Sequence, residues 1–143
     1  MPLRLAASHQ GERLTPDPHP SLIADREEVA AAIHDDGALL IDTMSEPHFH
    51  GKIALHDRPG HIPGASTVSA LGLLDEKDCY KPSVTLAELV DGGRNARFIT
   101  YCGAGIAASS NAFTMSRLGF TDVAVYMASL REWAADPANL MVA

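Results

Sequence analysis

The stretch Phe98-Ile99-Thr100-Tyr101-Cys102-Gly103-Ala104-Gly105 decides the fold that we expect for this chain. Its first four residues favour a β-strand, because aromatic and β-branched side chains suit a pleated, half-buried surface. Cys102 follows at once, and the next residues are small up to a helix predicted from about Ile106 to Leu118. A strand, a tight loop and a helix in this order are typical of a parallel α/β sheet, in which ligands gather at the carboxyl ends of the strands.

The chain on either side of this stretch repeats the alternation of strands and helices. Continuous apolar runs predict buried strands, and a capping box or a run of helical periodicity predicts each helix. The further predicted strands are 38–41, around 67–68, and 123–126. One helix is predicted to begin at the capping box of Asp25 and Glu28, a second to lie near 85–91, and a third to cover 130–135. Residues 43–60 are expected to form a long surface loop. We therefore predict an α/β fold, a single domain over residues 21–143 with a central parallel sheet and helices on both faces. Residues 1–20, rich in proline, are expected to form a tail or linker.

Composition excludes several classes of function. The 143 residues carry a net charge of −7 with scattered cations, which argues against nucleic-acid binding. No apolar run reaches the length of a membrane span, and the N-terminus lacks the pattern of a secretory signal. Cys79 and Cys102 are expected to be free thiols of a cytoplasmic protein, since a chain of this size needs no disulfide. No cofactor is indicated.

The loop after Cys102 has the composition of an anion cradle. Small residues let the backbone curl so that several N–H groups converge at the positive end of the following helix. The same field favours a thiolate, the nucleophilic form of cysteine. The residues of the predicted cradle are Gly103, Ala104, Gly105, Ile106, Ala107 and Ala108. From spacing alone, a buried and inert thiol stays open as the alternative.

Three stretches resemble the signatures of the rhodanese family of sulfurtransferases, closest to the C-terminal catalytic domain of thiosulfate/3-mercaptopyruvate sulfurtransferases. They are Tyr101–Ala108, the turn Gly60-His61-Ile62-Pro63-Gly64-Ala65, and the segment from Val125-Tyr126 through Ser129 and Glu132-Trp133 to Asp136-Pro137. The resemblance implies that Cys102 takes a sulfane sulfur from a small donor as a persulfide and passes it to a thiol or cyanide. It also implies that this chain matches one half of a two-domain protein, so a second copy, residues 1–20 or nothing would cover the site.

The chain also departs from the family pattern. Met44 and His48 stand where arginines are common, and Ala104 and Ala107 stand where hydroxyl side chains are common, which weakens recognition of an anionic donor. Arg58 is the nearest replacement. The candidates for substrate binding are therefore Arg58, His48 and His50.

Several alternatives stay open. A persulfide carrier or regulatory module with little turnover is the main one, with a homodimer or a protein sulfur acceptor as partner. Phosphatase chemistry is disfavoured because no arginine closes the loop between Cys102 and Arg117. The histidines of residues 48–61 do not fit a metal-site spacing, and His61 is expected to be structural. The same is expected of Asp42, as a cap, and Trp133, as a core anchor. Cys79 is expected to be a bystander, although it could resolve a persulfide on Cys102.

Overall fold

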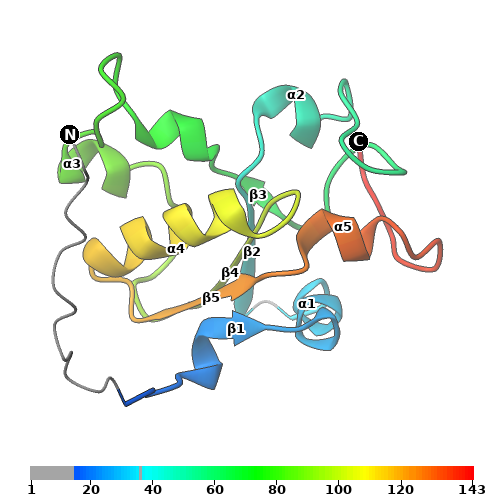
Figure 1. Ribbon diagram of the computed structural model, residues 1–143, viewed down its shortest axis with the longest axis horizontal. Coiled ribbons are helices and arrows are strands. Elements are labelled where there is room, and N and C mark those ends of the chain that lie inside the picture. Colours follow the sequence, from blue (N-terminus) through cyan, green and yellow to red (C-terminus); the bar gives the residue numbers. More distant parts are fainter. Residues whose placement is uncertain (1–14, 36) are drawn as a thin grey trace, which may run out of the picture.

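The protein, described by a computed structural model over residues 15–35 and 37–143, is built on one parallel sheet (Figure 1). The sheet has five strands in the order β1-β5-β4-β2-β3, and every pairing between them is parallel. The strands are β1 (Ile23–Ala24), β2 (Ala38–Asp42), β3 (Ser66–Thr67), β4 (Arg97–Tyr101) and β5 (Asp122–Tyr126). This confirms the predicted α/β fold and places β4, which leads to Cys102, at the centre of the sheet.

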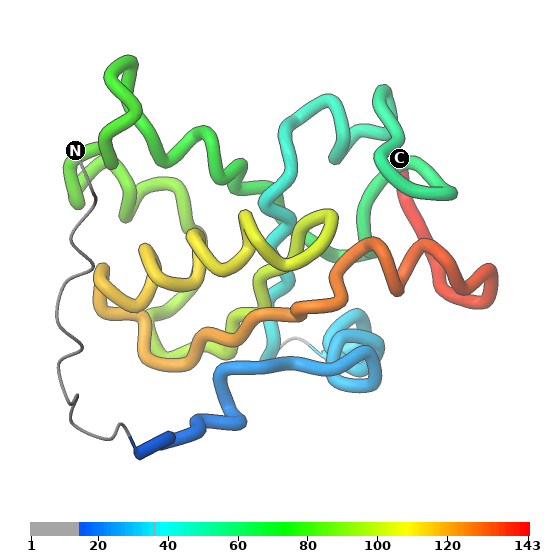
Figure 2. The backbone as a smooth tube through the Cα atoms, in the orientation of Figure 1, coloured from blue at the N-terminus to red at the C-terminus, as the bar shows by residue number. Residues whose placement is uncertain are grey.

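Helices cover both faces of the sheet, as Figure 2 lets the reader trace along the chain. They are α1 (Arg26–Ala32), α2 (Glu46–Phe49), α3 (Ser83–Ala87), α4 (Ile106–Arg117) and α5 (Ser129–Trp133), with short 3-10 turns η1 (Pro20–Leu22) and η2 (Ala70–Leu73). Side chains of α1 and α5 pack on one face, and those of α3, α4 and η2 pack on the other. The strand residues alternate between the two cores, so Phe98 faces α4 while Ile99 and Tyr101 face α1 and α5.

Several boundaries differ from the sequence-based expectation. Residues 43–60 are not entirely loop, since α2 lies within them with Pro47 in its first turn, where the missing N–H of proline costs nothing. The helix predicted near 85–91 ends at Ala87, and Leu89, which lies beyond its end, is exposed. β1 and η1 were not predicted because elements of two or three residues carry no periodicity. Of the predicted tail, residues 1–14 lie outside the described residues.

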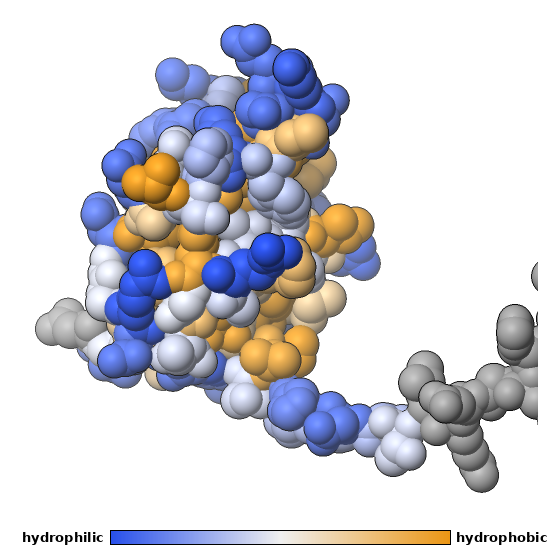
Figure 3. Space-filling view, turned by 90° about the vertical axis from the view of Figure 1, so that its left-hand side faces the viewer, coloured by the Kyte–Doolittle hydropathy of each residue, from blue (hydrophilic) through white to orange (hydrophobic). Residues whose placement is uncertain are grey.

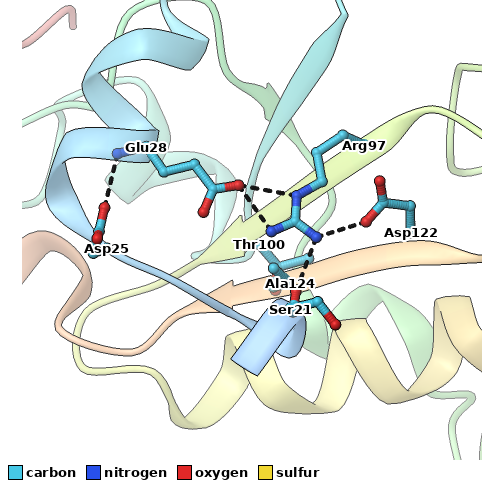
Figure 4. A network of polar contacts seen from close by, with 7 residues as sticks. All are labelled: Ser21, Asp25, Glu28, Arg97, Thr100, Asp122 and Ala124. Atoms are coloured by element: carbon cyan, nitrogen blue, oxygen red, sulfur yellow. Dashed lines mark hydrogen bonds and ion pairs between the residues drawn. The ribbon is translucent and has the colours of Figure 1, made fainter. Parts of the chain in front are cut away.

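Arg97 ties the amino-terminal edge of the sheet together (Figure 4). From β4, its guanidinium donates to the carboxylate of Glu28 on α1 at 2.8 and 3.0 Å and to that of Asp122 on β5 at 2.6 Å. It also donates to the carbonyl of Ser21 at 2.9 Å. Two of its nitrogens donate to the same oxygen of Glu28, and hydrogen bonds between charged groups are stronger than those between neutral ones. The network fixes four segments at the end of β4 that is opposite to Cys102.

The side of the molecule on which α3 and the C-terminal end of α4 lie shows apolar residues interrupted by charged ones (Figure 3). Val84 and Phe113 are among the exposed large apolar residues, and the guanidinium carbon of Arg117 lies 5.9 Å from the centroid of the Phe113 ring. Over the described residues, no helix has both the length and the apolar character that crossing a bilayer requires.

Asp42 ends β2 and is completely buried. One of its carboxylate oxygens accepts the amide N–H of Met44 at 2.8 Å, which confirms the capping role predicted from the sequence. Its other oxygen has no hydrogen-bond partner within residues 15–35 and 37–143. Burial raises the pKa of Asp42, and the bond from Met44 and the neighbouring Tyr101 only partly oppose that shift. Burial, together with the charge of Asp42, also raises the pKa of Tyr101 well above its ordinary value.

We predict that Asp42→Asn removes a pH-dependent loss of stability. A carboxyl group whose pKa is raised in the folded state stabilises the fold while it is protonated, and this contribution disappears as the pH rises through the folded pKa. The free energy of unfolding of Asp42→Asn minus that of the wild type should therefore be larger at pH 7 than at pH 4. Urea unfolding at a series of pH values measures it, with the exposed Asp57→Asn as the control. A difference between Asp42→Asn and the wild type that stays constant with pH would contradict the prediction.

Candidate active site

Cys102 is the first residue after β4, and its side chain is only 3% exposed. It joins the core on the α4 side of the sheet, yet its sulfur is not surrounded by hydrocarbon alone. The amide N–H of Gly105 donates to the sulfur across 3.0 Å. Gly105 has a φ of +85°, and a Cβ there would lie 2.6 Å from the carbonyl oxygen of Met127, so glycine is required at this position.

The carbonyl groups of the loop are held on one side. Those of Cys102 and Gly103 accept the amides of Leu130 and Arg131 from α5, each at 3.0 Å. The ring Nε2 of His56 lies 2.9 Å from the same Gly103 oxygen. In a trans peptide group the N–H of the next residue points in the direction opposite to the carbonyl, and the described chain has no cis peptide bond. The amides of Gly103 and Ala104 are therefore directed away from α5.

The first turn of α4 adds further donors. The amides of Ile106, Ala107 and Ala108 have no hydrogen-bond partner in the described part of the chain, as expected of a helix start. Among the described residues, one amide, that of Gly105, contacts the sulfur. The cradle predicted over residues 103–108 thus offers several backbone donors, and the binding of an anion by them stays a prediction.

Ser129 holds the start of the Cys102 loop by a hydrogen bond. It is completely buried and has a φ of +54°, a left-handed conformation that is unusual for a residue with a side chain. Its hydroxyl accepts the amide N–H of Cys102 at 3.1 Å and donates to the carbonyl of Tyr126 at 2.7 Å. The residue therefore connects the end of β5 to the start of the Cys102 loop.

Arg58, predicted as a candidate for substrate binding, is engaged with the backbone in the structure. Its guanidinium makes four hydrogen bonds of 2.7–3.4 Å to backbone carbonyls that follow or end α5. The acceptors belong to Trp133, Ala134, Asp136 and Asn139. Arg58 thus donates to carbonyls at and after the C-terminal end of α5, which lack donor partners within the helix, and so stabilises the fold.

His48 and His50, the other two substrate candidates, are likewise engaged elsewhere. The Nδ1 of His48 lies 2.8 Å from the hydroxyl of Ser45, and His50 is exposed and pairs with Glu46 at 3.1 Å. The cavity that both His48 and Arg58 line has a volume of only about 10 Å³. That is about the space of a single water molecule, too little for a sulfur donor.

The remaining predicted residues take the structural places expected of them. His61 stacks on Phe49 with ring centroids 3.7 Å apart, and its Nδ1 lies 2.8 Å from the Phe49 carbonyl. Trp133 is 1% exposed and donates to the carbonyl of Leu140, which confirms it as a core anchor. Cys79 and Cys102 are both free thiols, Cys79 on an exposed loop and Cys102 buried.

A cavity of about 210 Å³ lies beside the Cys102 loop. It is lined by Ala104, Met127, Ala128, Arg131 and Glu132. Sequence reasoning missed Arg131, His56 and the support role of Ser129. Ser129 lies within a stretch that resembles the family, but nothing local marks the other two, since a single arginine on a short helix or a histidine in a loop is ordinary.

Comparison with known proteins defines the class to which this fold and site belong. Residues 25–136 match the family described as Rhodanese-like domain. The chain therefore belongs to the rhodanese-like family. This agrees with the resemblance drawn from the Cys102 loop.

Curated relatives refine the comparison. The chain is similar to a probable 3-mercaptopyruvate sulfurtransferase of Pseudomonas aeruginosa, with 31% identity over 84% of this chain and 44% of the relative. It is also similar to a putative thiosulfate sulfurtransferase of Mycolicibacterium smegmatis, with 33% identity over 83% of this chain and 47% of the relative. The chain thus spans less than half the length of these relatives.

Solved structures support the fold alone. The anaerobic ergothioneine biosynthesis enzyme of Chlorobium limicola, solved with trimethyl histidine, superposes with a TM-score of 0.77 and 19% identity. A structure of EanB with hercynine superposes with a TM-score of 0.78 and 20% identity. In each case 86% of this chain matches 32% of the other.

We predict that substitutions at Ser129 separate backbone strain from hydrogen bonding. Ser129→Ala leaves the buried amide of Cys102 without its acceptor and keeps the left-handed strain, a loss of about 1–3 kcal/mol from the first cause. Ser129→Gly loses the same bonds but relieves roughly 1 kcal/mol of strain. Urea unfolding should therefore rank the wild type above Ser129→Gly and Ser129→Ala last. Equal stability of the two variants would contradict this account of the strain.

Proposed function

We propose that this chain is a sulfurtransferase that carries a sulfane sulfur on Cys102 as a persulfide. The observation that carries the proposal is the 3.0 Å contact from the Gly105 amide to the Cys102 sulfur, on a loop whose carbonyls are held away by α5. Membership of the rhodanese-like family supports it. An amide donor stabilises negative charge on sulfur, both on the thiolate and on the atom next to a persulfide anion.

The chemistry consists of two displacements. The Cys102 thiolate attacks the outer sulfur of a donor such as thiosulfate, the bond between the two donor sulfurs breaks, and sulfite leaves with its electron pair. A persulfide anion is left on Cys102. A thiophile such as cyanide then attacks the terminal sulfur, thiocyanate leaves, and the thiolate returns. Dividing one transfer into two displacements is covalent catalysis.

The donor class follows from the names of the relatives and from this chemistry. Relatives named for thiosulfate and for 3-mercaptopyruvate both support a small anionic donor. A thiol, cyanide or a protein thiol would be the acceptor. Two free cysteines favour a reducing compartment, and we propose the cytoplasm.

We predict that Cys102→Ser abolishes the gain of one sulfur atom that intact-mass measurement should show after incubation with thiosulfate or 3-mercaptopyruvate. Serine keeps the size of the side chain but has no thiolate to attack sulfur. Cys79→Ser is the matched control and should gain sulfur as the wild type does, because Cys79 lies on an exposed loop and is expected to be a bystander. Sulfur on the Cys102→Ser variant, or none on the wild type with either donor, would refute the proposal.

A persulfide carrier that turns over poorly is the second candidate. The chain spans less than half of its curated relatives, and Leu55, Ile106 and Met127, on or beside the Cys102 loop, are largely exposed. A partner, either a second copy or a protein acceptor, would then complete the site. Formation of thiocyanate in repeated turnovers supports the enzyme, whereas stable sulfur on Cys102 without turnover supports the carrier.

A further inference from the structure

The main chain of Arg131 contacts the Cys102 loop. Its amide N–H donates to the carbonyl of Gly103 at 3.0 Å, so its backbone lies beside the residue that follows the nucleophile. Its side chain lines the cavity of about 210 Å³ to which Ala104 of the loop also contributes. A cation is thus placed on the wall of a cavity to which the loop that carries the proposed nucleophile contributes Ala104.

The guanidinium of Arg131 has no structural task in the described part of the chain. No hydrogen bond or ion pair of its side chain occurs among residues 15–35 and 37–143, and the residue is exposed. Two other arginines of the fold differ in this respect. Arg58 binds four backbone carbonyls, and Arg97 binds Glu28 and Asp122.

The one acidic residue on the cavity wall is already engaged. The carboxylate of Glu132 accepts a hydrogen bond from the hydroxyl of Tyr126. Burial, and after it this hydrogen bond, raises the pKa of Tyr126. The chain as a whole carries a net charge of −7, which repels an anionic donor. An unpaired guanidinium at the cavity therefore gives an anion a local attraction that opposes the repulsion from the net charge of the chain.

We propose that Arg131 binds the anionic group of the sulfur donor, either a sulfonate-like oxyanion as in thiosulfate or a carboxylate as in 3-mercaptopyruvate. A guanidinium matches both groups through paired hydrogen bonds. This inference rests on the proposed function, since it concerns the donor of that reaction. It replaces the role that the sequence had suggested for Arg58.

The test compares thiol reagents that differ only in charge. Alkyl methanethiosulfonates react with a thiolate to give a mixed disulfide and methanesulfinate, and they exist with a neutral ethyl, an anionic sulfonatoethyl or a cationic trimethylammonioethyl group. Rates of modification of Cys102 are measured by mass spectrometry in a Cys79→Ser background, which removes the exposed thiol. Arg131→Met should lower the ratio of the anionic to the neutral rate about fivefold, the size expected for one charge near the surface.

Two controls make the result specific. Arg117→Met makes the same change of net charge at the far end of α4, about 17 Å along the helix from Ile106, and should leave the ratio unchanged. Arg131→Lys should keep most of the anionic preference, and added salt should weaken that preference in the wild type. In steady-state assays, Arg131→Met should raise the KM for thiosulfate and for 3-mercaptopyruvate, and the donor with the larger change identifies the anion that is recognised.

The outcomes distinguish this inference from the proposed function. If wild-type Cys102 takes sulfur but Arg131→Met leaves the reagent ratio and both KM values unchanged, the inference is wrong and the sulfurtransferase proposal stands. If the ratio falls as expected but Cys102 takes sulfur from neither donor, the anion subsite is supported and the sulfurtransferase proposal fails. Thermal unfolding of Arg131→Met should match that of the wild type, because the substituted side chain is exposed.

Discussion

The pairing between the Cys102 loop and the start of α5 is the contact on which the site depends. The amides of Leu130 and Arg131 belong to the first turn of a short helix and have no helical acceptor of their own. The carbonyls of Cys102 and Gly103 supply these acceptors. The same two bonds turn both carbonyls toward α5, so the amides of Gly103 and Ala104 point away from it. One set of backbone contacts thus completes a helix end and turns the amides of Gly103 and Ala104 away from α5.

This arrangement requires an unfavourable backbone conformation at Ser129. The residue is left-handed while its hydroxyl accepts the amide of Cys102, and such strain persists only where surrounding contacts determine it strongly. The contacts are strong here because α5 is fixed from both sides. Trp133 is buried in the core, and Arg58 binds the carbonyls at the end of the helix. Because Ser129 is part of α5 and its hydroxyl bonds the amide of Cys102, the fixed position of α5 also fixes the backbone at the nucleophile.

The distribution of arginines explains how an acidic protein could still handle an anionic donor. Arg97 neutralises two carboxylates at the amino-terminal edge of the sheet, and Arg58 serves backbone carbonyls. Both side chains are committed to the fold. The cavity beside the loop therefore depends on Arg131 for positive charge, while a backbone amide of the loop acts at the sulfur. Charge supplied by the backbone does not alter the net charge of the chain, so an acidic protein can retain it.

The sequence by itself determined the α/β class, the strand–loop–helix unit around Cys102 and the capping role of Asp42. These features depend on local causes, namely β-forming residues, small residues in the loop and a side chain that binds an amide two residues away. Only the tertiary structure decided the contacts of Arg58 and Ser129 and the place of Arg131 on the cavity wall. Arg58 binds carbonyls that lie 75 to 81 residues further along the chain, and Ser129 binds an amide 27 residues before it. A contact between residues so distant in sequence leaves no local pattern, because the folding of the whole sheet brings its partners together.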